Sequence, residues 1–246
     1  RIAHVSDLHL LTQDDVPLSR FLNKRVTGLL NLKLKRNQKH RPGHLAAVLR
    51  RVRTWAPDHV VVTGDLTNLA LESEFEAVRE LLETELGMSP DQISVVPGNH
   101  DLYMFPFSGS GRPRPTPESK RAGWRAFASA LGLGLHPSGA YVRHVPEASC
   151  VLVGLDSCVR PQRRFFRHNG AIGAEQSAFV RAVSETPEYR AARHRLVLLH
   201  HHVVPLPHGV GRRAPSEIGM RLDDAESAAR LFDEVGVTAV FMGIAT

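Results

Sequence analysis

The sequence predicts an α/β domain whose β-sheets are covered by helices on their outer faces. Two observations lead to this fold class. Strand-like and helix-like segments alternate along the whole chain, and several strand-like segments are almost wholly apolar, as in strands that are buried on both faces. The 246 residues, of which 42% are hydrophobic and 23% charged, suffice for one large domain with a full core. Since there is no internal repeat and no dividing linker, we expect a single domain over residues 1–246.

The first half of the chain shows three pairs of strand and helix. Each expected strand is a short apolar run, and helix 69–86 has the clearest helical period, with Gly87 as its stop signal. In order, we expect a strand at 2–6, a helix at 42–55, a strand at 59–64, a helix at 69–86, a strand at 93–97 and a helix at 118–131.

The second half begins with a pair of strands and then returns to alternation. Loops that are rich in Pro and Gly, at 105–117 and 203–220, separate the helices from the preceding strands. In order, we expect strands at 141–145 and 150–156, a helix at 173–185, a strand at 196–200, a helix at 222–235 and a strand at 238–243.

Positive charge is concentrated towards the N-terminus. The net charge is +6, yet from Val16 to Pro57 there is no acidic residue, against eleven Lys and Arg. Residues 18–37 mix these cations with leucines at helical spacing, so we expect a basic amphipathic insertion at about 16–41. Such a segment suits an anionic partner. We favour a membrane surface over nucleic acid, because the segment lacks the alternation of basic and aromatic residues that is typical of single-strand binding. The alternative is a helix that packs on the domain with its charges in water.

The cysteine content and the hydropathy indicate the compartment. Cys150 and Cys158 are too few for a disulfide framework or a zinc ribbon, so we expect two reduced thiols in a reducing compartment. No apolar run approaches the length that crosses a bilayer. We therefore expect a cytoplasmic protein, with peripheral contact to a membrane as a further option.

Metal-ligating side chains follow four of the expected strands, at the point where each strand ends. In α/β proteins the carboxyl ends of adjacent strands converge on one crevice, so these side chains are expected in one pocket. Carboxylate, amide and imidazole donors together suit Mn, Fe or Zn. The set is Asp7, His9, Asp65, Asn99, His100 and His200.

Asp65 and two glycines have particular places in this pocket. A carboxylate has two oxygens and can bridge two cations, which makes Asp65 the natural shared ligand. Asp7 and His9, two residues apart, both reach one cation where the chain bends at the strand end. Gly64 and Gly98 let the backbone turn tightly beside the site.

The motifs SDLHL, GDLTN, PGNHD and LLHHH, in this order, resemble those of the calcineurin-like metallophosphoesterase superfamily over nearly the whole chain. The resemblance implies a four-layer αββα sandwich, in which two mixed β-sheets are flanked by helices, with a two-metal centre at the strand ends. Asp7 and His9 would bind one ion, and Asp65 would bridge the two. Asn99 and His200 would bind the other ion.

The resemblance also distinguishes the histidines. In the LLHHH motif it places the ligand at the first histidine, His200, with His201 as the alternative and His202 as a bystander. His100 would face the phosphate, where it stabilises negative charge or protonates the leaving oxygen. Asp101 either orients the ring of His100 or caps the loop.

The C-terminal segment departs from the family pattern. The last expected strand runs into Gly243, where the family has a Gly-His-x-His motif whose two histidines each ligate one metal. Ile244 and Thr246 occupy the positions of these histidines. We therefore expect a fold that is truncated at the C-terminus, with weak metal binding and slow turnover.

Together these features predict a hydrolase of phosphoester or pyrophosphate bonds that uses a metal-bridging hydroxide as nucleophile and two Mn, Fe or Zn ions as cofactors. The expected substrate is a phosphorylated small molecule or a lipid-linked phosphate, with nucleotide-linked substrates as a further option. The lipid option rests on a looser similarity of the basic insertion to that of bacterial UDP-2,3-diacylglucosamine hydrolases. The alternative is a catalytically impaired member of the fold that acts as a binding scaffold.

Overall fold

The computed structural model describes residues 1–10, 42–68, 70–102, 117–158, 169–204 and 220–243. The basic insertion expected at about 16–41, most of the loops at 105–117 and 203–220, and the positions of Ile244 and Thr246 lie outside the described residues. In the described part, strands alternate with helices, so the predicted α/β class is confirmed.

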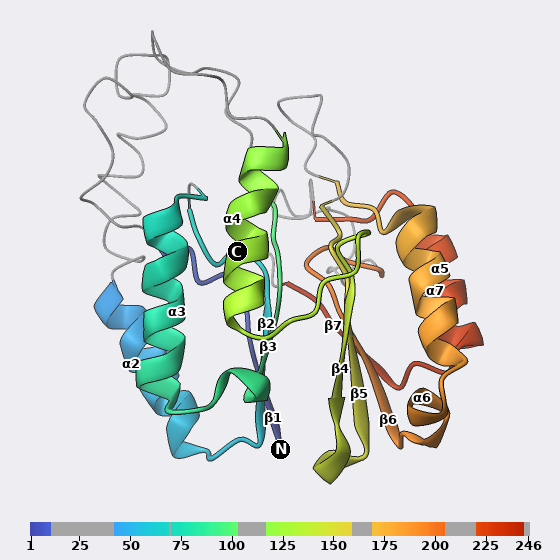
Figure 1. Ribbon diagram of the computed structural model, residues 1–246, viewed down its shortest axis with the longest axis horizontal. Coiled ribbons are helices and arrows are strands. Elements are labelled where there is room, and N and C mark those ends of the chain that lie inside the picture. The colour runs from blue at the N-terminus through green and yellow to red at the C-terminus, as the bar shows by residue number, and fades with distance from the viewer. Residues whose placement is uncertain (11–41, 69, 103–116, 159–168, 205–219, 244–246) are drawn as a thin grey trace, which may run out of the picture.

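The described strands form two separate sheets, seen nearly edge-on in the centre of Figure 1. The first sheet has the order β1-β2-β3 and is parallel throughout. The second has the order β4-β5-β6-β7, in which β4 and β5 are antiparallel and the other neighbours parallel. The strands are β1 (Ile2–Val5), β2 (His59–Thr63), β3 (Ile93–Val96), β4 (Tyr141–Val145), β5 (Cys150–Gly154), β6 (His194–Leu198) and β7 (Ala239–Phe241).

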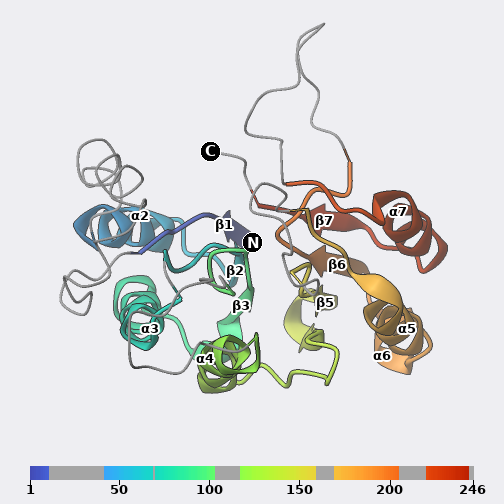
Figure 2. The ribbon, with the colours of Figure 1, turned by 90° about the horizontal axis from the view of Figure 1, so that it is seen from above.

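Helices lie on the outer side of each sheet, so the four layers expected from the resemblance are present (Figures 1 and 2). The first sheet is flanked by α2 (Pro42–Thr54), α3 (Glu72–Leu86) and α4 (Pro117–Ala130). The second is flanked by α5 (Gly173–Ser184), α6 (Pro187–Ala191) and α7 (Ala225–Glu234). Two short 3₁₀-helices, η3 (Pro90–Gln92) and η4 (Pro146–Ala148), precede β3 and β5. None of the helices in the described residues has the length and apolar character that crossing a membrane requires.

Strand β5 shows how the two sheets divide the core. Its side chains are all buried, with Cys150 and Leu152 in the cluster that includes the first sheet. Val151 and Val153 instead belong to the cluster that includes α5 and α7. Because successive side chains of a strand point to opposite faces, β5 packs against the first sheet on one side and against helices on the other.

The strands that lead to the strand-end motifs stop earlier than predicted. β1, β2 and β3 end one residue, and β6 two residues, before the expected boundary. Left-handed backbone follows, with φ of 56° at Asp7, 85° at Gly64 and 49° at Asp65. Because extended ladders exclude such angles, the chain turns out of the sheet where the candidate metal-ligating residues begin.

Two helices begin three residues later than predicted. Before α3, Ala70 has a φ of 54°, which a right-handed helix cannot include. Before α7, Leu222 forms an isolated β-bridge with Gly170, and the carboxylate of Asp224 accepts a hydrogen bond of 2.8 Å from the amide of Gly173. Left-handed backbone therefore delays the start of α3, and tertiary pairing delays the start of α7.

Candidate metal centre

The first two strand-end motifs lie side by side at one edge of the first sheet. β1 and β2 are parallel neighbours, and hydrogen bonding continues past their ends. The amide of Asp7 donates to the carbonyl of Gly64 at 3.2 Å, and the amide of His9 donates to the carbonyl of Asp65 at 2.7 Å. This backbone pairing brings the side chains of Asp7, His9 and Asp65 into one cluster.

The carboxylate of Asp65 lies at the centre of this cluster. Its Oδ2 is 3.5 Å from Nε2 of His9, and its Oδ1 is 3.7 Å from Nε2 of His200. Oδ1 of Asn99 lies 3.1 Å from the same Nε2 atom of His200. Oδ1 of Asp7 lies 3.9 Å from Nε2 of His9. Asp65 thus presents one oxygen to an imidazole after β1 and the other to an imidazole after β6, in the second sheet.

These donors form two groups that each suit one cation. The groups are His9, Asp65 and His100, and Asp7, Asp65 and His200, and within each the donor atoms lie within 4.8 Å of one another. Asp65 is common to both. The residues therefore fit a pair of divalent ions with a shared carboxylate, and the oxygen and nitrogen donors are those that Mn, Fe or Zn accept.

Burial and charge act together on Asp65, which is only 4% exposed. Burial raises the pKa of this carboxyl, but electrostatic interaction with the imidazoles of His200, His100 and His9, with a hydrogen bond from the amide of His100, outweighs it, so the pKa is lowered. Asp65 is therefore an anion at neutral pH, as a bridging ligand must be.

The ring of His200 is held in one orientation. Its Nδ1 donates to the carbonyl oxygen of Thr63 at 3.0 Å, which leaves Nε2 directed at Asp65 and Asn99. A hydrogen bond to the far ring nitrogen is the usual way in which a protein fixes a metal-binding imidazole. Gly64 is required here, because a Cβ at this position would lie 2.5 Å from Nδ1 of His200.

Asp101 holds the two loops of the site together. Its carboxylate accepts hydrogen bonds from the amides of Leu66, Thr67 and Gly98 at 3.2, 2.8 and 2.9 Å, and from the Thr67 hydroxyl at 2.8 Å. Nδ1 of His100 instead donates to the carbonyl of Asn68 at 3.2 Å. Of the two roles expected for Asp101, these contacts support loop capping. Burial and then the charge of Asp65 raise the pKa of Asp101 to about 6.

Comparison with known proteins gives the family of this chain. The model of the calcineurin-like phosphoesterase family matches residues 1–243. The chain belongs to this family. Two solved structures show the same fold at 14% sequence identity. No match was found among curated protein sequences.

The first of these structures is purple acid phosphatase PPD1 from yellow lupin (Lupinus luteus) seeds, with a TM-score of 0.55. The alignment covers 98% of this phosphoesterase but 37% of the lupin chain, so this chain spans well under half the length of that protein. The second is a dimetal phosphatase from Danio rerio, with a TM-score of 0.53 and coverage of 98% of this chain and 78% of that chain.

The other two histidines of the phosphoesterase's LLHHH motif are buried beside the site. Nδ1 of His201 shares a hydrogen bond of 2.7 Å with the hydroxyl of Ser157. Nε2 of His202 donates to the carbonyl of Gly243 at 2.9 Å. Both rings therefore have protein partners in the structure, and His202, which was expected to be a bystander, contacts the end of β7.

Three contacts that position site residues were not predicted from the sequence. The hydroxyl of Ser6 donates to Oδ2 of Asp7 at 2.5 Å. The carbonyls of Thr63 and Asn68 orient His200 and His100, as described above. Ser6 and Asn68 belong to the motifs SDLHL and GDLTN. Their closeness in the sequence to the candidate ligands Asp7 and Asp65 could have indicated these roles.

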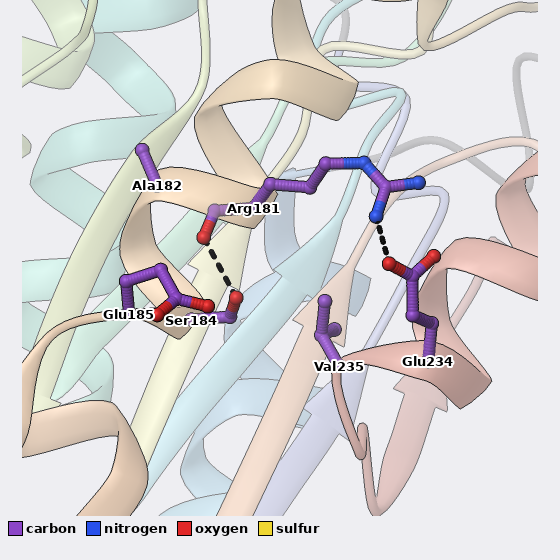
Figure 3. Close-up of a pocket in the computed structure, with 6 residues that line it drawn as sticks. All are labelled: Arg181, Ala182, Ser184, Glu185, Glu234 and Val235. Atoms are coloured by element: carbon purple, nitrogen blue, oxygen red, sulfur yellow. Dashed lines mark hydrogen bonds and ion pairs between the residues drawn. The ribbon is translucent and has the colours of Figure 1, made fainter.

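A hollow of about 410 Å³ lies apart from these motifs, between the C-terminal ends of α5 and α7 (Figure 3). Arg181 and Glu234 form an ion pair across it. None of the strand-end residues lines this hollow, and its contacts support the packing of the two helices.

Proposed function

We propose that this phosphoesterase hydrolyses phosphoester or pyrophosphate bonds with two divalent transition-metal ions as cofactors. The observation that carries the proposal is the position of Asp65, whose Oδ2 atom lies near Nε2 of His9 and whose Oδ1 atom lies near Nε2 of His200. When bound, such a pair of ions lowers the pKa of a water molecule and offsets charge on the phosphoryl oxygens.

We divide the residues between the two ions as the family resemblance implies. Asp7 and His9, whose Oδ1 and Nε2 atoms lie 3.9 Å apart, hold one ion, although Asp7 also lies close to the donors of Asp65 and His200. Asn99 and His200, which lie 3.1 Å apart, hold the other, and Asp65 contributes to both. The left-handed φ values of Asp7, His9 and Asp65, 56°, 45° and 49°, are rare for residues other than glycine and are typical of sites where function outweighs backbone strain.

His100 acts on the substrate in this proposal. Its ring lies edge to face against His9 with 4.8 Å between centroids, and its Nδ1 is engaged with the carbonyl of Asn68. Nε2 is then the nitrogen that carries a proton to the leaving oxygen or stabilises negative charge on the phosphoryl group. This role differs from that of a ligand, although the His100 ring lies near the donors of His9 and Asp65.

The substitution Asp65→Asn tests the two-metal proposal. The amide removes the shared negative charge, so we expect the loss of both ions and of turnover. Metal content is measured by elemental analysis, and turnover is measured with bis-p-nitrophenyl phosphate in the presence of Mn²⁺. The matched control is Asp91→Asn, an exposed carboxylate in η3 before β3, which should retain both.

Two results would contradict the proposal in different ways. Undiminished turnover in Asp65→Asn would exclude the shared-ligand mechanism. A wild-type protein that holds two ions yet cleaves neither diesters, monoesters nor pyrophosphates would favour the alternative of a catalytically impaired binding scaffold.

For the partner, we propose a nucleotide- or lipid-linked phosphate substrate and peripheral contact with an anionic membrane. The support for the membrane contact is α2 and the residue that follows it. Val48 and Trp55 are 49% and 55% exposed, and the guanidinium of Arg51 lies 6.0 Å from the centroid of the Trp55 ring. Spacings of three and four place these side chains on one helical face. A face with apolar, aromatic and cationic side chains is typical of helices that bind lipid headgroups.

A further inference from the structure

Three contacts join the loop after β6 to the end of β7. The amide of Gly243 donates to the carbonyl of His200 at 3.0 Å, which continues the ladder of the two parallel strands. The amide of Val203 contacts Sδ of Met242 at 3.3 Å. The ring of His202 donates from Nε2 to the carbonyl of Gly243 at 2.9 Å. The last contact is made by the side chain of His202, so a substitution at His202 removes it.

His202 is held so that its ring reaches β7. Its backbone amide donates to the carbonyl of Met220 at 2.5 Å, and its carbonyl accepts from the amide of Leu222 at 3.1 Å. The residue is 4% exposed, so the ring lies in the protein interior. Because a carbonyl oxygen can only accept, Nε2 of His202 carries the proton in this hydrogen bond.

The backbone of Gly243 in turn packs closely against the ring of His200. A Cβ at position 243 would lie 2.8 Å from Nδ1 and 3.1 Å from Cε1 of His200. A Cβ at Gly64 would lie 2.5 Å from the same Nδ1. The backbones of Gly64 and Gly243 therefore both lie close to the His200 ring, whose Nδ1 donates to Thr63. If Gly243 moves, the His200 ring loses one of these two close backbone contacts.

The position of Gly243 depends on few contacts within the described residues. β7 has three residues and pairs with β6 along one edge of the second sheet. The end of a short edge strand opens more readily than the centre of a sheet, because few hydrogen bonds and apolar contacts oppose opening. The hydrogen bond from His202 stabilises the end of β7 at Gly243, which also contacts His200.

We propose that His202 is a positioning residue for the metal centre. Through Gly243 it holds the ring of His200 in the orientation that directs Nε2 at Asp65 and Asn99. The proposal rests on the proposed function, in which His200 is a metal ligand. It gives the third histidine of LLHHH a task that is distinct from metal binding.

Two substitutions at one position test this role. His202→Leu fills the space but has no donor, whereas His202→Gln retains an N–H group at nearly the position of Nε2. We expect His202→Leu to weaken the binding of the second Mn²⁺ ion by about 10- to 100-fold, the range found when the partner of a metal ligand is lost. We expect His202→Gln to remain within a few-fold of wild type. Isothermal titration of the metal-free full chain with Mn²⁺ measures both.

A second readout needs neither metal nor activity. The Nδ1 proton of His200, which donates to a buried carbonyl, should give a slowly exchanging downfield proton resonance in the metal-free protein. It should persist in His202→Gln and be lost or broadened in His202→Leu. If the wild type bound no Mn²⁺, the proposed function would fail, while this resonance would still test the contact between His202 and His200.

The control separates positioning from general stability. His59→Leu removes another buried histidine, which lies in β2 and shares a hydrogen bond of 2.9 Å with Ser94 of the neighbouring strand β3. It should lower the free energy of unfolding but leave Mn²⁺ affinity and the His200 resonance unchanged. Wild-type affinity and resonance in His202→Leu would overturn the proposal. So would a loss in His202→Gln as large as that in His202→Leu, since His202 would then be a ligand itself.

Discussion

His100 takes part in the site through both its backbone and its ring. The backbone amide donates to Oδ1 of Asp65 at 2.9 Å, and substitution of the side chain leaves this contact in place. We therefore expect His100→Ala to keep a metal content close to that of wild type while kcat falls about 10²- to 10⁴-fold, the usual effect of a general acid. Elemental analysis and steady-state kinetics on the same preparation check this. Parallel loss of metal and activity would identify His100 as a ligand.

Asp101 is the residue whose loss should affect the loops most. In Asp101→Asn an NH₂ group replaces one of two oxygens that accept hydrogen bonds from amides. Buried donors that lose their acceptor cost about 1–3 kcal/mol, so the free energy of unfolding should fall by about this amount. Urea denaturation of the metal-free protein measures the change, with the exposed Asp91→Asn as control. Equal stability of Asp101→Asn and wild type would show that the carboxylate does not hold the loops.

At the scale of elements, α2 differs from the other helices by its outward face. Arg50 pairs with Glu85 of α3 at 3.1 Å, whereas Arg51 lies against Trp55, which is exposed. We expect the double variant Arg51→Glu, Trp55→Ala to bind vesicles of phosphatidylserine and phosphatidylcholine less tightly than wild type. Wild-type binding should weaken as salt rises, because exposed charges are screened beyond about 8 Å at physiological ionic strength. Vesicle sedimentation measures both effects.

The control for this prediction is a charge reversal on the other flank of the molecule. Arg230→Glu in α7 changes the net charge as Arg51→Glu does, and Arg230 is likewise on a helix surface. Its effect on vesicle binding should be small. Vesicle binding that is insensitive to salt, or equal in all variants, would contradict the membrane contact. The charges of α2 would then simply be solvated.

At the scale of the whole molecule, a polar cluster joins the two sheets away from the metal centre. The hydroxyl of Tyr141 in β4 donates to the carbonyl of Val95 in β3 at 3.0 Å, and the neighbouring Ser94 shares a hydrogen bond with His59. Burial, and then the charge of Arg143, lower the pKa of His59 to about 4 from an ordinary value of 6.5. The folded protein therefore keeps His59 neutral at pH values where the unfolded chain protonates it.

The sign of the pH dependence follows from this depressed pKa. The stability that neutral His59 contributes is complete above pH 6.5 and is lost as the pH falls towards about 4. One proton taken up on unfolding changes the free energy of unfolding by at most about 1.4 kcal/mol per pH unit. We expect the stability of the metal-free wild type, relative to His59→Gln, to fall between pH 6.5 and 4.5 in urea denaturation. A difference that is independent of pH would contradict the buried neutral state.

The sequence alone was sufficient for the fold class, the order of the elements and the residues that gather at the strand ends. These features depend on local signals, since apolar runs predict buried strands and strand ends converge wherever parallel strands are neighbours. The confirmed family and the proximity of Asp7, His9, Asp65, Asn99 and His200 follow from such signals. The boundaries were less accurate, because left-handed residues such as Asp7 and Ala70 end or delay an element without a local pattern.

Only the tertiary structure decided which partners hold those residues in place. Thr63 accepts the hydrogen bond of His200 from a residue 137 positions away in the chain, through a backbone carbonyl that every residue type possesses. His202 likewise donates to Gly243, 41 positions away. The carboxylate of Asp101 accepts hydrogen bonds from backbone amides that follow β2 and β3. A residue's type states which bonds its side chain can form, but the approach of separate strands determines which partner is within reach. For this reason the sequence indicated the candidate ligands but not the groups that hold them in place.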